Sequence, residues 1–397
     1  MGKLTISSRN AIMQESPIRK LAPLAVKAKS QGVHVYHLNI GQPDIKTPQI
    51  MIDAYHNIPP VIEYGPSEGL HSYRKKLVSY YKKVNIPVDE SNIFITTGGS
   101  EAIIFTLLSA LSPGDEVIIP EPFYTNYNGF AVMAGVNVVP ITTKIENGFD
   151  LPPMKDFKAK LTPRTKAIVI CNPGNPTGAV FSRERLQELV NFARKNNLYV
   201  ISDEVYREFT YEGTATSILE FEDFEDNAVM IDSTSKRYSA CGSRIGCIVT
   251  KNKELLKLIL KFGQARLCPP SVDQVAAEAA IDTPDSYFKA VKKEYQKRRD
   301  VAYTELCRIP GAVVPNPKGA FYMVVGLPVK DADDFAKWLL SDFRYKNETT
   351  MVAPASGFYA TEGLGKNQIR IAYVLKTEDL KKAIHILKLG LTEYKKK

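Results

Sequence analysis

A lysine and an arginine follow one strand-like run in a pattern that could hold a reactive phosphorylated compound. Lys236 ends the run STSK (233–236), directly after the apolar segment AVMID (228–232), and Arg244 lies eight residues further on. A lysine at a strand end can act as a nucleophile toward an aldehyde. Serine hydroxyls with a guanidinium beside them can bind a phosphate. We therefore expect a site for a phosphate next to an aldehyde.

Two glycine-containing turns follow other strand-like runs. TTGGSEA (96–102) opens a helix-like segment, whose free N–H groups and positive dipole end favour an anion. It matches neither the dinucleotide fingerprint nor the P-loop pattern, so NAD and ATP are not favoured as ligands. The second turn, CNPGNPTG (171–178), places the amide of Asn175 between a glycine and a proline. As bare turns, both segments could also be ordinary connections.

A carboxylate follows a further strand-like run. In SDEVYREF (202–209), Asp203 ends the strand and Tyr206 comes about one helical turn later. A buried aspartate needs a cationic partner. The protonated nitrogen of a pyridine ring is such a partner, and its proton makes the ring an electron sink. The alternative is that Asp203 only caps a helix.

These residues must be positioned by the elements between them, which alternate between strands and helices. Alternation of this kind predicts a mostly parallel sheet covered on both faces, with ligands bound beyond the carboxyl ends of the strands. One intervening helix-like segment, 183–197, has the apolar spacing of a single buried face. The seven runs expected to form the sheet are 92–97, 116–120, 136–141, 166–171, 198–202, 228–232 and 244–250.

The remainder of the chain predicts a second, smaller α+β domain. We expect residues 46–285 to form the large domain, and residues 1–45 and 286–397 to form the small one. The first 45 residues precede the main sheet and have no partner there. The elements expected after residue 285 are a charged helix (285–306), hairpin-like strands (311–327), a helix (331–342), a strand (368–374) and a final helix (376–394).

Composition excludes several other classes of protein. The formal net charge is +9 over 397 residues, but no nucleic-acid recognition module accompanies it, so a solvated basic surface is expected. Five scattered cysteines without a C-x-x-C pair argue against disulfides and a metal site. No apolar run has the length of a signal peptide core or a membrane span. These features predict a cytoplasmic protein.

The four motifs together resemble the class I/II aminotransferases of the pyridoxal-phosphate fold type I family, over essentially the whole chain. The resemblance implies that Lys236 holds the cofactor as a Schiff base and moves the proton of the substrate's α-carbon. It implies that Asp203 pairs with the pyridinium nitrogen. Tyr206 and Asn175 match the pair that hydrogen-bonds the ring's phenolate oxygen, and Tyr124 matches the aromatic residue stacked on the ring.

The resemblance also implies a homodimer with shared active sites. Tyr64, in EYGPSEG (63–69), matches a tyrosine that reaches the cofactor phosphate of the neighbouring subunit. The residues expected to bind that phosphate within the same chain are Gly99, Ser100, the amide of Glu101, Ser233, Ser235 and Arg244.

Two further matches concern the amino-acid substrate, which Tyr124 and Asn175 should contact as well. Arg370, in NQIRIAY (367–373), resembles the arginine that binds the α-carboxylate through a bidentate pair. Gly41, in NIGQPD (39–44), resembles the loop glycine whose backbone covers the same group. Ordinary alternatives are a surface charge for Arg370 and a plain turn for Gly41.

The choice of substrate rests on fewer residues. One bacterial branch of aspartate aminotransferases has a lysine directly after the glycine pair, where this chain has Ser100. Arg266, in QARLCPP (264–270), lies about two residues from the position where another branch brings an arginine across from the partner subunit. We expect Arg266 to bind the side-chain carboxylate of an acidic substrate, with a helix-surface charge as the alternative.

The leading hypothesis is a pyridoxal-phosphate-dependent aminotransferase that moves an amino group from an L-amino acid, aspartate by preference, to 2-oxoglutarate by a ping-pong mechanism. A broad or aromatic aminotransferase and a cysteine–sulfur β-lyase would use the same lysine and aspartate. A non-catalytic regulator that senses an amino acid is disfavoured, because 45 residues ahead of the sheet leave no room for a DNA-binding domain.

Overall fold

A seven-stranded sheet forms the centre of the computed structural model, which describes residues 4–396. The strand order is β2-β8-β7-β6-β5-β3-β4, and only β8 runs antiparallel to its neighbours. All seven predicted strands are confirmed. Their bounds are β2 (Ile93–Thr97), β3 (Glu116–Glu121), β4 (Asn137–Thr142), β5 (Thr165–Cys171), β6 (Tyr199–Asp203), β7 (Ala228–Ser233) and β8 (Ile245–Val249).

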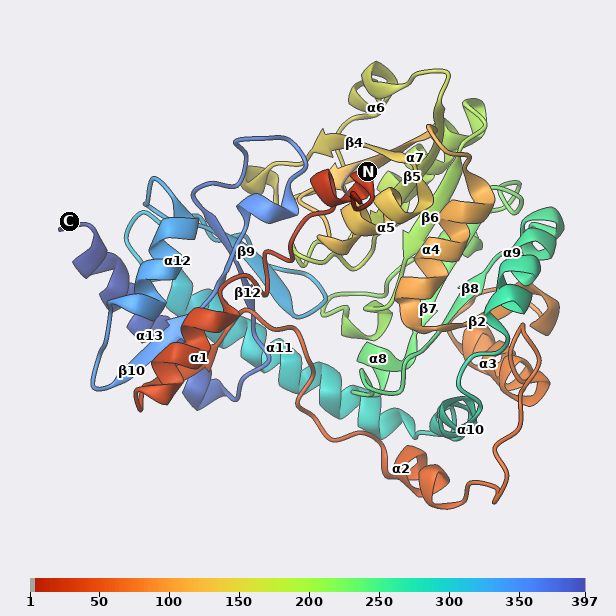
Figure 1. Cartoon of the computed structure of the whole chain (residues 1–397), viewed down its shortest axis with the longest axis horizontal. Coiled ribbons are helices and arrows are strands. Elements are labelled where there is room, and N and C mark those ends of the chain that lie inside the picture. The colour runs from red at the N-terminus through yellow and green to blue at the C-terminus, as the bar shows by residue number, and fades with distance from the viewer. Residues whose placement is uncertain (1–3, 397) are drawn as a thin grey trace.

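Helices cover both faces of this sheet, which explains why its inner strands are apolar throughout rather than alternating (Figure 1). Every residue of β7 and β8 is buried. One face is packed by α3 (His71–Lys83), α6 (Met154–Lys160) and α7 (Arg183–Lys195). The opposite face is packed by α4 (Gly98–Ala110), α5 (Asn126–Ala134) and α9 (Lys253–Arg266).

The helix α7 illustrates how the sequence specifies these layers. Ser182 caps its first turn by accepting a hydrogen bond from the backbone N–H of Arg185. Its hydrophobic residues recur at helical spacing, and the structure buries Leu186, Leu189 and Val190 against the sheet. The single buried face predicted for residues 183–197 is therefore confirmed.

A smaller α+β domain stands beside the large sheet. Strands β11 (Ala353–Pro354), β12 (Gln368–Ala372) and β9 (Tyr322–Gly326) form an antiparallel sheet, and β1 (His34–His37) pairs in parallel with β10 (Glu348–Met351). Its helices are α1 (Ala22–Ser30), α11 (Asp285–Cys307), α12 (Ala332–Ser341) and α13 (Thr377–Tyr394). α11 runs from this domain toward α10 (Ser271–Ala280), which packs on α2 (Gln49–His56) (Figure 1). The domain boundaries at residues 45 and 285 remain a prediction.

The hairpin predicted for residues 311–327 is wrong in its first half. Only β9 forms a strand, and a single antiparallel bridge joins Val313 to Gly326. Pro315 and Pro317 lie in the intervening segment, and neither has the N–H that a ladder requires. The segment instead turns toward the large domain, where the N–H groups of residues 318 and 319 both donate to the carbonyl of Gly178.

The start of the chain also differs from expectation. Helix α1 packs on α12, as an N-terminal segment of the small domain should. Residues before it lie against the large domain instead, with the Asn128 amide of α5 donating to Gln14 at 3.0 Å (Figure 1). The N-terminal segment therefore spans the gap between the domains. No helix within residues 4–396 is long and apolar enough to cross a membrane.

Candidate active site

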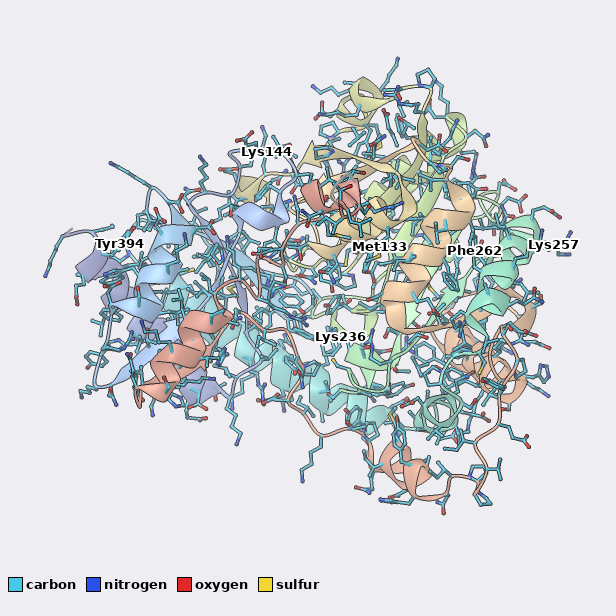
Figure 2. All side chains as sticks on the ribbon, viewed as in Figure 1. Met133, Lys144, Lys236, Lys257, Phe262 and Tyr394 are labelled. Carbon is cyan, nitrogen blue, oxygen red and sulfur yellow. The ribbon has the colours of Figure 1, made fainter. Side chains whose placement is uncertain are left out.

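A cavity of about 730 Å³ opens between the carboxyl ends of the large sheet's parallel strands and the small domain. Lys236 lies in this central region (Figure 2). The volume is typical of sites for small molecules and cofactors. The sequence-predicted residues that line it are Gly41, Gly99, Ser100, Tyr124, Asn175, Asp203, Tyr206, Ser233, Ser235, Lys236, Arg244 and Arg370.

The floor of the cavity brings the glycine pair and Arg244 together. The backbone of α4 begins at Gly98 with a φ of +73°, and a Cβ there would lie 2.5 Å from the Arg244 guanidinium. Across the sheet, a Cβ at Gly246 would lie 2.5 Å from the Gly98 carbonyl carbon. Only glycine fits at both positions, so the first turn of α4 packs directly onto β8 beside a cation. This arrangement suits a bound phosphate.

Lys236 is held on the short helix α8 (Thr234–Arg237), which follows β7 without a loop. The Ser233 hydroxyl caps this helix by accepting from the N–H of Ser235 at 3.1 Å. The Lys236 amine lies 3.3 Å from the Gly41 carbonyl oxygen and 3.5 Å from the Cys241 sulfur. No carboxylate within residues 4–396 pairs with this amine, which leaves it available to a ligand.

Asp203 is a buried carboxylate at the end of β6. One of its oxygens accepts a 2.7 Å hydrogen bond from the Tyr127 hydroxyl, and the other accepts a longer one from the N–H of Val205. Burial is the largest influence on its pKa and raises it to about 6. Among the described residues no basic side chain forms an ion pair with it. A cationic group bound in the cavity would supply the missing partner.

Arg370 lies in β12 and is buried, with 2% of its surface exposed. It donates to the Asn39 carbonyl at 2.5 Å and to the Asn175 side chain at 3.2 Å, and its Nε has no hydrogen-bond partner. Burial lowers its pKa. No carboxylate in the described part of the chain pairs with it. The guanidinium is therefore arranged to receive an anionic group from outside the protein.

Tyr322 is a site residue that the sequence motifs did not identify. Its hydroxyl lies 3.0 Å from that of Tyr206 and 3.3 Å from the Gly41 carbonyl, and Arg370 lies 4.6 Å from the centre of its ring. A Cβ at Gly41 would lie 1.9 Å from this hydroxyl, so the tyrosine requires a glycine opposite it. Tyr322 lies two residues before Val324, the register partner of Arg370, so both side chains lie on the same face of the sheet. No motif in the sequence marks this position.

A buried ionic layer supports the floor of the cavity from the other face of the sheet. Asp232 pairs with Arg237 and accepts from the Tyr81 hydroxyl at 2.9 Å, while Arg207 donates to Glu204 at 2.5 Å. Each charged member is the sequence neighbour of a cavity residue. For Asp232, which lies in β7 before Ser233, the reason is that consecutive strand residues point to opposite faces of the sheet. Breaking such a buried pair leaves an uncompensated charge, which costs about 3–5 kcal/mol.

Three sequence-predicted residues do not line the cavity of their own chain. Tyr64 is 82% exposed. Glu101, whose backbone amide was expected to bind the phosphate, uses its side chain to accept from the N–H of Thr97 at 2.8 Å. Arg266 lies 3.6 Å from Glu101 and donates weakly to the carbonyls of Ser67 and Ile95. The expectation that Tyr64 and Arg266 reach a neighbouring subunit's site stays a prediction.

The fold and this cavity are those of an enzyme, since an amine, a carboxylate and a guanidinium converge at the strand ends of an α/β sheet. The chain belongs to the family of class I and II aminotransferases, whose family model matches residues 33–387.

The names of similar proteins refer to different substrates. An aspartate aminotransferase of Sulfolobus acidocaldarius is 34% identical over 81% of this chain and 80% of its own length. The (5-formylfuran-3-yl)methyl phosphate transaminase of Methanocaldococcus jannaschii is 32% identical over 96% of this chain and 98% of its own. The structure of an alanine aminotransferase from Pyrococcus furiosus superposes with a TM-score of 0.90 at 31% identity, covering 98% of this chain and all of that one.

Proposed function

We propose that this chain transfers the amino group of aspartate to 2-oxoglutarate by a two-stage ping-pong reaction, with pyridoxal phosphate attached at Lys236. The observation that carries this proposal is the convergence, in one cavity, of the Lys236 amine with two buried and unpaired charges, Asp203 and Arg370. A cationic ring nitrogen can pair with the Asp203 carboxylate, and the α-carboxylate of an amino acid can pair with the Arg370 guanidinium.

The residues present fit this cofactor. The glycine-lined start of α4 and Arg244 suit its phosphate, and Asp203 suits its protonated ring nitrogen. Tyr206 and Asn175 offer hydrogen-bond donors for the ring oxygen, and Tyr124 offers an aromatic face. Bound pyridoxal phosphate supplies an aldehyde for amines and a ring that withdraws electrons from the substrate's α-carbon.

In the reaction, the protein's own groups orient the substrate and move one proton. Arg370 binds the α-carboxylate through two parallel hydrogen bonds, which fixes the α-carbon relative to Lys236. The Lys236 amine would accept the proton of the substrate's α-carbon as a general base and carry that proton during the reaction. Asp203 would hold the ring nitrogen of a bound cofactor in its protonated form.

A broad or aromatic aminotransferase and a cysteine–sulfur β-lyase use the same central groups. A panel of amino donors, each incubated with 2-oxoglutarate, separates the three. Glutamate formation fastest from aspartate supports the proposal. Comparable rates with phenylalanine or tyrosine would indicate the broad enzyme, and pyruvate with ammonia from cysteine or cystathionine would indicate the lyase.

Replacing Arg370 with alanine should penalise every donor, because all amino acids carry an α-carboxylate. Loss of a charge-assisted bidentate contact is expected to lower kcat/KM by roughly 10- to 150-fold for aspartate and alanine alike. Steady-state kinetics with both donors measures this. An effect confined to one donor would contradict the role in α-carboxylate binding.

We also propose a homodimer with shared active sites. Apolar side chains are uncovered along residues 58–64, including Val61, Ile62 and Tyr64. Neighbouring Leu267, at the end of α9, is 53% exposed. The two segments lie side by side, since the Ser271 hydroxyl donates to the Glu63 carbonyl. An uncovered apolar surface of this kind suits a protein interface.

Complementation should reveal whether Tyr64 acts across that interface. A Lys236→Ala subunit and a Tyr64→Ala subunit are each expected to be weak alone. Co-expressed, they should form hybrid dimers in which one site contains both native residues, so activity should exceed the sum of the separate variants. A mass measurement of a stable, fully active monomer would contradict the shared site.

A further inference from the structure

The outer wall of the cavity carries basic side chains that the reaction described above does not use. Arg19, Lys29 and His37 all line the cavity, together with the residues of its floor. Asp203, already assigned to the ring nitrogen, is the acidic residue among the described lining residues. The wall is therefore positively charged, and no acidic side chain among its described residues balances this charge.

Arg19 is not engaged by the protein. Within residues 4–396 its side chain makes neither an ion pair nor a hydrogen bond. The next residue, Lys20, points elsewhere and pairs with Asp333. Arg19 also lies close enough to Tyr124 to lower the pKa of that phenol, although burial dominates and raises it to about 12. The guanidinium is thus free and near the expected position of the cofactor ring.

A chain of hydrogen bonds holds the neighbouring segment in place. The Lys29 ammonium lies 2.7 Å from Nε2 of His37, and Nδ1 of His37 lies 3.2 Å from the Asn39 side-chain oxygen. An ammonium can only donate, so His37 accepts at Nε2 and donates at Nδ1. Burial and Lys29 both lower the pKa of His37, which favours this neutral form. Asn39 in turn donates to the Ile18 carbonyl at 3.2 Å.

Asn39 links this segment to the proposed α-carboxylate site. Its side chain holds Ile18, the residue before Arg19, while its own carbonyl accepts from Arg370 at 2.5 Å. One residue therefore contacts Arg370 directly and holds the backbone next to Arg19. Two guanidinium groups that line one cavity suit a small molecule with an anion at each end.

We propose that Arg19, supported by Lys29, binds the distal anionic group of the substrate, and that this group is the side-chain carboxylate of an acidic amino or oxo acid. The inference rests on the proposed aminotransferase function and names the residue that selects its substrate class. This chain has Ser100 where one bacterial branch has a lysine after the glycine pair, so that lysine is absent here. The proposed role of Arg19 requires no contact from a second subunit.

The test compares Arg19→Ala with Lys27→Ala. Lys27 lies on the same helix as Lys29 and carries the same charge as Arg19, but it does not line the cavity. Arg19→Ala is expected to lower kcat/KM for aspartate and glutamate by about 10-fold, the lower end for a charged hydrogen bond because Arg19 is exposed. Alanine and phenylalanine should be unaffected, and Lys27→Ala should match the wild type with all four donors.

Ligand binding gives a readout independent of turnover. The dissociation constant of maleate, a dicarboxylate, should rise about 10-fold in Arg19→Ala, whereas that of the monocarboxylate propionate should stay constant. Arg19→Lys should recover part of the maleate affinity by restoring a charge. These constants can be measured calorimetrically on the cofactor-loaded protein.

Several results would overturn the inference. Equal effects of Arg19→Ala on all donors, or none, would do so, as would a selective loss of acidic donors in Arg266→Ala with Arg19→Ala unchanged. If O-phosphoserine were turned over faster than aspartate, and this turnover depended on Arg19, Arg19 would still bind the distal anion. The preferred anion would then be a phosphate and not a carboxylate. Absence of transamination by the wild type with every donor would instead overturn the proposed function itself.

Discussion

Lys236→Ala is expected to lose covalent attachment of pyridoxal phosphate and to lower turnover by at least roughly 10⁴-fold. The substitution removes the group that forms the link and the group that moves the proton, and proton transfer alone contributes up to about 10⁴-fold. The fold should survive, because among residues 4–396 the Lys236 amine makes only two long contacts, to Gly41 and Cys241. Borohydride reduction followed by mass spectrometry of the Lys236 peptide measures the attachment.

Two variants control this experiment. Lys257→Ala removes an exposed lysine of α9, remote from the cavity (Figure 2), and should retain both colour and activity. Lys236→Arg keeps a positive charge but cannot lose a proton in the working range, so it should be as inactive as Lys236→Ala. Near-wild-type transamination by either Lys236 variant would refute the central proposal.

Asp203→Asn should have opposite effects on activity and on stability. Turnover is expected to fall by roughly 100-fold, because a neutral amide cannot hold the ring nitrogen in its charged form. The cofactor-free variant should nevertheless be more stable than the cofactor-free wild type at pH 7. Asparagine keeps an acceptor for the Tyr127 hydroxyl while removing an unpaired buried charge.

The sign of the stability effect follows from the pKa. Burial raises the pKa of Asp203 from 3.8 to about 6, so the folded state binds this proton more tightly than the unfolded state. Stability should therefore fall as pH rises from about 4 to about 6, and the full cost, up to about 3 kcal/mol, persists above pH 6. Asp203→Asn should flatten this dependence in chemical denaturation. If Asp203→Asn were destabilised but had normal turnover, Asp203 would have a structural role only. Asp203→Glu should retain more activity than Asp203→Asn.

The sequence predicted the floor of the cavity better than its wall. Asp203, Lys236 and Arg244 each adjoin a strand of the sheet. A correct prediction of the strands is therefore enough to predict that these residues meet at one edge of the sheet. Tyr322 carries no motif, and its strand was assigned within a hairpin that prolines prevent from forming. Predicting its contact with Gly41 requires the packing of segments 281 residues apart.

Charged contacts were the hardest to predict. Arg266 was assigned to substrate from its place in the sequence, but within its own chain the structure brings it to Glu101, which lies one helical turn into α4. Arg19 was not predicted as a site residue, because an isolated arginine near the start of the chain belongs to no motif. Its place in the same cavity as Arg370 depends on the packing of distant segments, as in the contact of Arg370 with Asn39, 331 residues earlier.

The segment that bridges the two domains has a consequence for engineering. The cavity floor depends on strand ends and on a buried ionic layer, so substitutions there should disturb cofactor binding and folding together. Residues 16–42 contribute the opposite wall from a separate helix and a two-stranded sheet. A library confined to residues 16–29, which leaves Asn39 and Gly41 unchanged beside Arg370 and Lys236, should therefore change the accepted side chains while leaving cofactor affinity intact. Donor preference could then be altered separately from cofactor binding.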